Sequence, residues 1–233
     1  MTSGGTGYAG VLFDFSGTLF RLEPDPAWFA GLADAEGRIL DDAAQRELLH
    51  RMTVPVGPPV PMEGEALRTW HARDLSSADH RDAYLHILEH SGIADEAERE
   101  RLYGEFSNPL NWTIYPDTAA VLRAARDAGL TVGVLSNIGY DIRPAFEREG
   151  IADLVDQFVL SFEVGHAKPD LAVFHAATAA LGLPPERVLM VGDSAEADGA
   201  SRTIGCGFAQ VEPLPVDARP AGLLDAVRAA GAI

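Results

Sequence analysis

The sequence lacks several features that would point to particular classes of protein. It has one cysteine, Cys206, in 233 residues, so no disulfide can form within the chain. No apolar run approaches the roughly 18 residues that a membrane-spanning helix needs. The first residues, MTSGGTGYAG, have neither the basic nor the apolar segment of a signal peptide. These absences lead us to expect a cytoplasmic protein that does not contact a membrane.

Positive charge is also scarce. The chain has 18 Lys and Arg against 35 Asp and Glu, which gives a formal net charge of −17. No basic patch is visible, so we expect no nucleic-acid partner. The same net charge repels small anions. A phosphate site would therefore need concentrated local positive charge, from a bound cation or a well-placed lysine.

What is present is typical of a packed globular protein, with 47% hydrophobic and 23% charged residues. The length predicts one or two domains and, in solution, a monomer or homodimer. Residues 1–10 are expected to be a flexible leader before a strand at 10–15. From residue 24 to 110 only helical periodicity is found, broken by a rigid loop at 54–61. The helices expected there span 26–35, 40–53, 63–73, 78–91 and 95–106.

From residue 113 onward, helices and short apolar strands alternate. Strands are expected at 131–136, 158–161, 187–192 and 207–211, and helices at 117–128, 141–149, 170–181, 196–204 and 220–230. Such repeats predict a mostly parallel sheet that is covered on both faces. The sequence thus predicts a doubly wound, Rossmann-like α/β core made of residues 1–21 and 113–233. An all-helical cap, residues 22–112, is inserted after the first strand.

Polar residues follow the expected strands at four places. Asp14 ends the first strand, Ser136 and Asn137 end another, Lys168 precedes a helix, and Asp193 ends a further strand. An aspartate after a strand is often only a helix cap. All four groups, however, lie at the carboxyl edge of the sheet, where ligands bind in open α/β folds. We therefore expect one site there, with the cap beside it.

The segments DFSGT, LSN, KPD and GDSAEAD, in this order, resemble the four motifs of the haloacid dehalogenase (HAD) superfamily. The resemblance extends over the whole chain, including a helical cap between the first two motifs, and favours the phosphatase-like branch. It implies a hydrolase that acts on a small phosphorylated molecule and needs Mg²⁺. It also implies the fold already expected from the strand and helix pattern.

The resemblance assigns roles to individual residues. Asp14 would be the nucleophile that forms an aspartyl-phosphate, and Lys168 would neutralise charge on Asp14 and on the phosphoryl group. Mg²⁺ suits a cluster of carboxylates, which would otherwise raise one another's pKa. The implied metal ligands are Asp14, the backbone carbonyl of Ser16, Asp193 and Asp198. The implied phosphate-binding residues are Thr18, Ser136, Asn137 and Lys168, with the backbone N–H groups near Asn137 and Ile138.

Ser16 departs from the family pattern. In HAD phosphatases the residue two positions after the nucleophile is an aspartate, which protonates the leaving oxygen and then activates water. The pKa of a serine hydroxyl lies far from the working pH, and losing such a group typically costs about 10²–10⁴ in rate. Ser16 is therefore retained as a catalytic-site residue that slows hydrolysis.

Three functions remain open at this point. The protein is a slow or specialised phosphatase that prefers aryl or acyl phosphates, a degenerate member that binds a phosphorylated ligand or partner without turnover, or a 2-haloacid dehalogenase. Halide leaves as an anion and needs no acid, so the third function tolerates Ser16. Against it, Asp193 would face an anionic haloacid, and the dehalogenase branch generally lacks that acid.

Two further motifs and one group of residues also suggest functions. GTGYAG at 5–10 precedes its strand, so it does not fit a dinucleotide fingerprint. His86-Ile-Leu-Glu89-His90 matches an inverted zinc-protease pattern, although a polar helix face is the simpler interpretation. Phe20, Arg21, Trp70, His71 and Arg73 are candidates for substrate specificity. With His80 and Arg81, the last three form an aromatic and basic cluster in the cap. The alternative is that Trp70 packs in the cap and the arginines of this cluster pair with nearby acids such as Asp74 and Asp82.

Overall fold

The chain is described by a computed structural model that covers residues 7–53 and 57–233. Most of the expected leader and the start of the loop at 54–61 lie outside these residues. Five parallel strands form one sheet in the order β5-β4-β1-β6-β7. The strands are β1 (Gly10–Phe13), β4 (Thr131–Ser136), β5 (Gln157–Leu160), β6 (Val188–Gly192) and β7 (Gly207–Gln210). The doubly wound α/β fold predicted from the sequence is confirmed.

Strand β1 is the central strand of the sheet, and both of its faces are covered. All four of its residues are buried, and it pairs with β4 on one side and β6 on the other. Val11 and Phe13 point into one hydrophobic cluster, whereas Leu12 points into another. Because both edges are paired and both faces are buried, no side of β1 faces solvent. Its carboxyl end is therefore the part of β1 that can present a polar side chain to a ligand.

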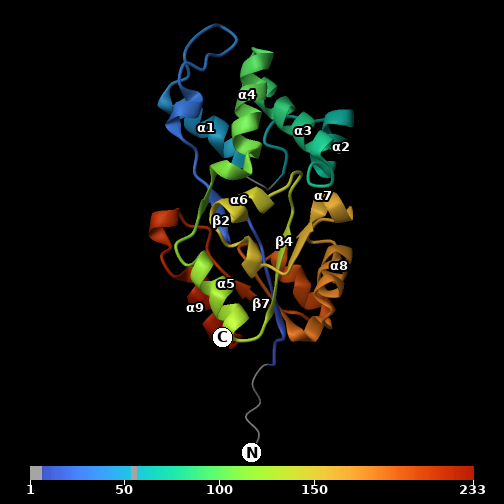
Figure 1. Cartoon of the computed structure of the whole chain (residues 1–233). Helices are drawn as coiled ribbons and strands as arrows, with labels where there is room; N and C mark the ends of the chain where they lie inside the picture. Colours follow the sequence, from blue (N-terminus) through green and yellow to red (C-terminus); the bar gives the residue numbers. More distant parts are fainter. Residues whose placement is uncertain (1–6, 54–56) are drawn as a thin grey trace, which may run out of the picture.

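Helices cover the two faces of the sheet (Figure 1). One face packs against α5 (Thr118–Asp127), α6 (Arg143–Arg148) and α9 (Gly222–Ala229). The other packs against α7 (Ser161–Val164), α8 (Leu171–Leu181) and the 3₁₀ helix η5 (Asp198–Ile204). The shorter 3₁₀ helices of this part are η3 (Ala152–Leu154), η4 (Pro185–Arg187) and η6 (Val216–Ala218).

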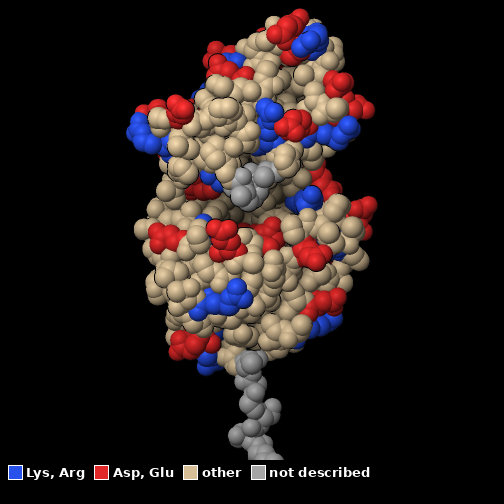
Figure 2. All heavy atoms as spheres, turned by 180° about the vertical axis from the view of Figure 1, so that it is seen from behind, with Lys and Arg blue, Asp and Glu red and all other residues tan. Residues whose placement is uncertain are grey.

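The inserted helices form a separate lobe above the carboxyl edge of the sheet (Figure 1). They are η1 (Pro26–Phe29), α1 (Asp42–Thr53), α2 (Gly64–Ala72), α3 (Ser77–His90), α4 (Glu96–Ser107) and η2 (Pro109–Asn111). This lobe has its own hydrophobic cluster, which includes Trp28, Trp70 and Ile87. Two short antiparallel strands, β2 (Phe20–Leu22) and β3 (Trp112–Ile114), lead into it and out of it. Seen from behind, the surface is hollowed at the waist between the lobes (Figure 2).

Several expected elements differ in the structure. The helix expected at 26–35 is only the four-residue η1, because Gly31, with φ of +77°, turns the chain out of helical geometry. The helix expected at 196–204 is the 3₁₀ helix η5. The leader ends earlier than residue 10, since Ala9 N–H donates to the carbonyl of Arg187 at 2.7 Å. Among the described residues, no helix is long and apolar enough to cross a membrane.

Candidate active site

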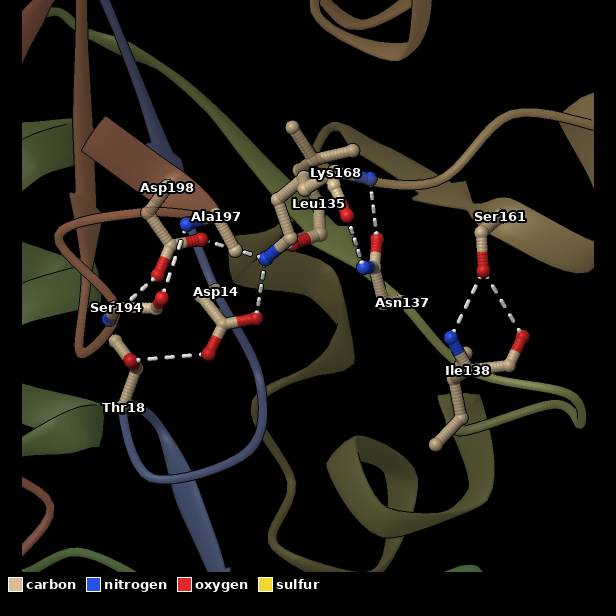
Figure 3. A network of polar contacts seen from close by, with 10 residues as sticks. All are labelled: Asp14, Thr18, Leu135, Asn137, Ile138, Ser161, Lys168, Ser194, Ala197 and Asp198. Carbon is tan, nitrogen blue, oxygen red and sulfur yellow. Dashed lines mark hydrogen bonds and ion pairs between the residues drawn. The ribbon is translucent and has the colours of Figure 1, made fainter. Parts of the chain in front are cut away.

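The carboxyl ends of three neighbouring strands bring the predicted polar residues together. Asp14 follows β1, Ser136 is the last residue of β4, and Asp193 follows β6. Asp14 is 5% exposed and Ser136 is 1% exposed. Lys168 comes from the loop between α7 and α8 and reaches the same point (Figure 3). The topology therefore gathers four segments that are far apart in the chain.

The Lys168 ammonium group is the centre of this network (Figure 3). Its Nζ lies 2.6 Å from Asp14 Oδ1 and 2.6 Å from Asp198 Oδ1, and it donates to the carbonyl of Leu135 at 3.1 Å. An ammonium has three donors, so these contacts satisfy all of them. The side chain is 3% exposed. A buried and fully bonded ammonium is a fixed positive charge beside the Asp14 carboxylate.

The Asn137 side chain fixes the backbone of Lys168. Its Nδ2 donates to the Lys168 carbonyl at 2.7 Å, and its Oδ1 accepts from the Lys168 N–H at 2.7 Å. The expectation for Asn137 was phosphate binding. In the structure its amide instead makes a reciprocal pair with the Lys168 backbone. This contact of the side-chain amide places the lysine, and phosphate binding by the backbone N–H near Asn137 stays a prediction.

The loop after the nucleophile is held from both sides. Thr18 Oγ1 donates to Asp14 Oδ2 at 3.1 Å, so each carboxylate oxygen of Asp14 accepts a hydrogen bond. Gly17 has φ of +74°, and a Cβ there would lie 2.4 Å from Asp193 Oδ2. Glycine is thus required both by the turn and by the close approach of a carboxylate. Ser16, in the same loop, is exposed.

Arg219 supports this loop from the C-terminal part of the chain, and it was not predicted from the sequence. Its Nη1 donates to the Gly17 carbonyl at 2.7 Å, and its Nη2 donates to the Thr18 carbonyl. The guanidinium carbon lies 3.1 Å from the centre of the Tyr115 ring, and the residue is 4% exposed. No motif marks a residue that acts 201 positions away through backbone carbonyls.

Three carboxylates meet at the edge of the sheet. One oxygen from each of Asp14, Asp193 and Asp198 lies within 4.8 Å of the others. Asp198 is 1% exposed, and its second oxygen accepts from the Ser194 N–H at 2.9 Å. Gly192 lets this carboxylate approach, since a Cβ there would lie 2.2 Å from Asp198 Oδ2. Asp193 keeps partial exposure, so it is the member of the cluster most open to a ligand.

The pKa values of Asp14, Asp193 and Lys168 are shifted because carboxylates lie close together in a buried place. Burial raises the pKa of Asp14 to about 7, with contributions from Asp198 and Asp193, although Lys168 opposes the shift. Burial and Asp198 raise the pKa of Asp193 to about 6. Burial acts to lower the pKa of Lys168, but Asp14 and Asp198 outweigh it and the pKa is raised. The lysine therefore stays charged, while the acids carry a cost that a cation would relieve.

This donor set fits a divalent cation. Three carboxylate groups and one ammonium leave surplus negative charge at a point that is mostly shielded from water. Hard oxygen ligands of this kind are those that Mg²⁺ prefers, and one or two carboxylates are enough to hold it. The buried acidic cluster could therefore bind a metal ion.

The loop after β4 contacts the cap through Ser161, another residue that sequence reasoning missed. Ser161 Oγ accepts from the Ile138 N–H at 2.8 Å and donates to the carbonyl of Asp74 in the cap. The Ile138 N–H, expected to face phosphate, is thus directed at a side chain. Burial raises the pKa of the Asp74 carboxyl, while Arg73 and Lys168 act to lower it. Asp74 therefore brings an acidic cap side chain within electrostatic reach of Lys168.

The five candidate specificity residues fall into two groups, Phe20 and Arg21 on β2 and the three others at the end of α2. Phe20 is fully buried among core aromatic rings, and Trp70 is 3% exposed inside the cap. The structure therefore does not support a substrate contact for either. Arg21 binds the carbonyl of Pro213 at 2.5 Å, and His71 is exposed on α2. The guanidinium carbon of Arg73 lies 3.9 Å from the centre of the Trp70 ring.

The alternative pairings of the arginines are confirmed. Arg73 lies 3.5 Å from Asp74, and Arg81 lies 3.3 Å from Asp82. Burial raises the pKa of Tyr84 to about 12, and Arg73 acts to lower it through a hydrogen bond. Of the five candidates, Arg73 is the one whose neighbours, Asp74 and Tyr84, lie near the junction of cap and core.

Comparison with known proteins identifies the family of this chain. A family profile described as haloacid dehalogenase-like hydrolase matches residues 8–201, and the chain belongs to this family. Phosphoserine phosphatase from Thermus thermophilus is 35% identical over 135 residues, which cover 58% of this chain and 52% of that protein. (S)-2-haloacid dehalogenase from Pseudomonas fluorescens is 31% identical over 126 residues, covering 53% of this chain and 54% of that one.

The solved structures show the same fold. A HAD family enzyme from Bacteroides thetaiotaomicron, in complex with magnesium and inorganic phosphate, aligns with a TM-score of 0.58 at 17% identity. The alignment covers 90% of this chain and 96% of that one. The chain spans about half the length of the curated relatives it matches. Family and fold are thus shown, and phosphatases and dehalogenases both occur among the relatives.

Proposed function

We propose that this protein is a Mg²⁺-dependent phosphatase or phosphotransferase for a small phosphorylated metabolite, working through an aspartyl-phosphate on Asp14. The observation that carries the proposal is the pairing of a buried carboxylate with a buried ammonium, Asp14 with Lys168, beside a further acid at Asp193. An orientated carboxylate with a fixed cation at its side is the arrangement needed for attack on a phosphorus atom.

In the first step a carboxylate oxygen of Asp14 forms a bond to phosphorus, and the bond between phosphorus and the leaving oxygen breaks. The leaving oxygen takes the electron pair. Lys168 holds Asp14 Oδ1 and offsets the negative charge of the transferring group, and Thr18 holds Oδ2. Ser136 lies at the end of β4, where its hydroxyl can donate to a phosphate oxygen. In the second step a water oxygen forms a bond to phosphorus and the bond between phosphorus and the Asp14 oxygen breaks. Inorganic phosphate leaves, the Asp14 carboxylate is restored, and the proton lost by the water passes to the phosphate or to solvent.

Asp14, Asp193 and the backbone carbonyl of Ser16 are the groups that would hold Mg²⁺, with Asp198 completing the acidic cluster. When bound, the ion would neutralise the carboxylates and the phosphate oxygens. Asp198 is less open to the ion than Asp193, because it is buried and both of its oxygens already accept hydrogen bonds, from Lys168 and from the Ser194 N–H. Its main role in this proposal is to place the lysine.

Ser16 determines which substrates react well. At the position of the family acid, it cannot supply a proton to an alkoxide or take one from water near neutral pH. Leaving groups that depart as stable anions avoid the first problem. We therefore expect aryl and acyl phosphates to be preferred over alkyl phosphates, and the phosphoenzyme to be long-lived.

The second candidate is a protein that binds a phosphorylated ligand without turnover, and the lack of a carboxylate at Ser16 favours it. It would retain phosphate and Mg²⁺ binding through Lys168 and the acids. A dehalogenase is less favoured, because Asp193 stays in the site next to the position of an anionic haloacid.

A turnover panel separates these functions. The substrates are p-nitrophenyl phosphate, acetyl phosphate, an alkyl phosphate and chloroacetate, each with and without Mg²⁺, on the native protein and on Asp14→Asn. We expect Mg²⁺-dependent phosphate release that is lost in Asp14→Asn, and a phosphoenzyme that can be trapped by acid quench. Phosphate binding with no turnover on any substrate would establish the binding function, and Mg²⁺-independent chloride release would establish the dehalogenase.

A further inference from the structure

A second group of metal-binding side chains lies on the cap, away from the nucleophile. One ligand atom from each of His86, Glu89 and His90 lies within 4.8 Å of the others. These residues belong to the last turns of α3, whose earlier part carries His80 against Gly139 of the core. A helix rises about 1.5 Å per residue, so the group lies roughly 10–15 Å further along α3 than the contact with the core.

Helix geometry explains why the three side chains meet. Residues three and four positions apart lie on the same face of a helix, so both Glu89 and His90 neighbour His86. The two imidazole rings are 3.9 Å apart at their centres and are inclined by 30°. Two imidazoles so close on successive turns can present nitrogen atoms to a single ion.

The hydrogen bond of His90 fixes which of its nitrogens is available. Nδ1 lies 3.0 Å from the backbone carbonyl of His86. A carbonyl oxygen can only accept, so Nδ1 carries the hydrogen and the lone pair of the neutral ring is on Nε2. Metal-binding histidines are held in this way, with the second nitrogen donating to a carbonyl or carboxylate.

His86 gives a further observation that does not depend on the spacing of the three residues. Its Nε2 is buried and has no hydrogen-bond partner among the described residues. A buried polar atom without a partner is unfavourable, and such atoms are uncommon in folded proteins. A metal ion bound by nitrogen atoms of both rings would give this nitrogen a partner.

The surroundings favour a cation. Beside His86, between α3 and α4, lies a hollow of about 320 Å³ whose lining includes the carboxylates of Asp82, Glu89, Glu96 and Glu100. Two arginines also line it, Arg81 and Arg99, but they do not pair with all four carboxylates. Arg81 pairs with Asp82 and Glu100.

Arg99 donates to the backbone carbonyls of Ile93 and Ala94, at 2.9 and 2.8 Å. Its guanidinium therefore does not neutralise the carboxylate of Glu96 through an ion pair. Negative charge thus remains in excess around the two histidines.

We propose that His86, Glu89 and His90 form a site for a borderline transition-metal ion, with Zn²⁺ as the expected occupant. Two imidazole nitrogens and one carboxylate oxygen are a donor set that Zn²⁺ accepts and Mg²⁺ does not seek. Water completes the coordination shell. The ion bridges two successive turns at the end of α3. Glu89 serves as a ligand here, so the site does not supply the free glutamate that a zinc protease uses as its base.

Zinc binding is measured by isothermal titration of the metal-free full chain, in excess Mg²⁺ so that the acidic cluster of the core is occupied. We expect a single equivalent of Zn²⁺ for the native protein. His90→Gln and Glu89→Gln should each weaken binding at least about tenfold. His71→Gln, which changes an exposed histidine of α2, should bind as the native chain does.

Co²⁺ serves as a spectroscopic substitute for Zn²⁺, because its visible bands report imidazole ligation. These bands should appear with the native chain and disappear with the double variant His86→Gln/His90→Gln. Circular dichroism confirms that each variant is folded. Absence of Zn²⁺ binding by the native chain, or equal binding by the double variant, would overturn the proposal. The core site contributes no histidine, so this outcome does not depend on the proposed phosphatase activity.

Discussion

At the scale of single residues, the site is organised around Lys168. Its backbone is held by the Asn137 amide and its ammonium by Asp14, Asp198 and the Leu135 carbonyl. Three other segments of the chain therefore converge on this one residue. A group that is held at both ends loses little further entropy when a substrate binds, which is what a preorganised electrostatic site requires.

Ser16 gives the first prediction. Ser16→Asp places a carboxylic acid where the leaving oxygen departs, and we expect turnover of alkyl phosphates to rise by about 10²–10⁴. Acetyl phosphate should gain less in the first step, because its leaving group needs no proton. Ser16→Asn is the matched control, since it has a similar size and no titratable group. If Ser16→Asp and Ser16→Asn turn over alkyl phosphates equally, the account given for Ser16 is wrong.

Arg219 gives the second prediction. Arg219→Gln leaves buried carbonyls of the nucleophile loop without donors, at Gly17 and Thr18, and we expect the free energy of unfolding to fall by about 3 kcal/mol. The metal site should weaken too, because the Ser16 carbonyl belongs to the same loop. Urea denaturation and Mg²⁺ titration measure the two effects.

The control for Arg219 is Arg228→Gln, an exposed arginine on α9. It should change stability by no more than about 0.5 kcal/mol. Equal loss of stability in the two variants would mean that the carbonyl contacts of Arg219 contribute nothing specific.

The sequence located the acids and the lysine, but not the residues that support them. Asp14, Lys168 and Asp193 stand beside recognisable strand ends, and the parallel topology then brings them together. Arg219 and Ser161 act through backbone carbonyls and N–H groups far away in the chain. Hydrogen bonds to the backbone place no demand on residue type at the partner position, so they leave no pattern to read.

At the scale of elements, the periodic segments were predictable and the short ones were not. β4 (Thr131–Ser136) is predicted to the residue, because an apolar run between two amphipathic helices has few alternatives. The pair β2 and β3 was missed, since three residues cannot show an alternating pattern. This pair carries the connections to the cap, so the least visible elements determine how the two lobes are joined.

Gly139 tests the contact between cap and core. A Cβ on Gly139 would lie 2.4 Å from the Cβ of His80, which is closer than side-chain carbons approach. We expect Gly139→Ala to displace the cap and to cost about 1–3 kcal/mol in the free energy of unfolding. Gly104→Ala in α4 is the control. Nothing lies within 4 Å of its added carbon, and it should stabilise by about 0.5–1 kcal/mol. Similar effects at both positions would contradict the proposed contact.

His80 makes the same contact sensitive to pH. Its Nδ1 lies 3.0 Å from the Tyr103 hydroxyl, and its ring packs against Tyr84 and Tyr140. Burial, with a smaller contribution from the Arg73 charge, lowers its pKa to about 3. The unfolded chain then binds a proton that the folded chain does not. This part of the stability is present above pH 6.5 and is lost as the pH falls toward 3.

We therefore expect His80 to contribute about 2 kcal/mol to the loss of stability between pH 7 and pH 5. Urea denaturation at the two pH values measures it, and His80→Gln should reduce the loss by that amount. His50→Gln, an exposed histidine of α1, should leave the loss unchanged. A native pH dependence that persists in His80→Gln would show that other groups cause it.

At the scale of the whole molecule, the net negative charge opposes the binding of an anionic ligand. The chain carries a net charge of −17, and three of its acids, two of them buried, sit where the substrate phosphate would enter. A protein of this charge repels an anionic substrate unless the repulsion is offset locally. The fold offsets it with one lysine, and the proposed Mg²⁺ would offset it further. Stability and substrate binding should therefore respond together to the cation.

Magnesium should stabilise the folded chain by mass action. At a free Mg²⁺ concentration about 100 times the dissociation constant, the gain is about 2.7 kcal/mol, and for a chain of this length that raises the melting temperature by roughly 5–10 °C. NaCl at equal ionic strength is the control, because it screens the net charge without occupying the site. Asp193→Asn removes the carboxylate most open to the ion, and its melting temperature should respond to MgCl₂ no more than to NaCl. An equal rise with MgCl₂ in the native chain and in Asp193→Asn would place magnesium binding elsewhere on the acidic surface.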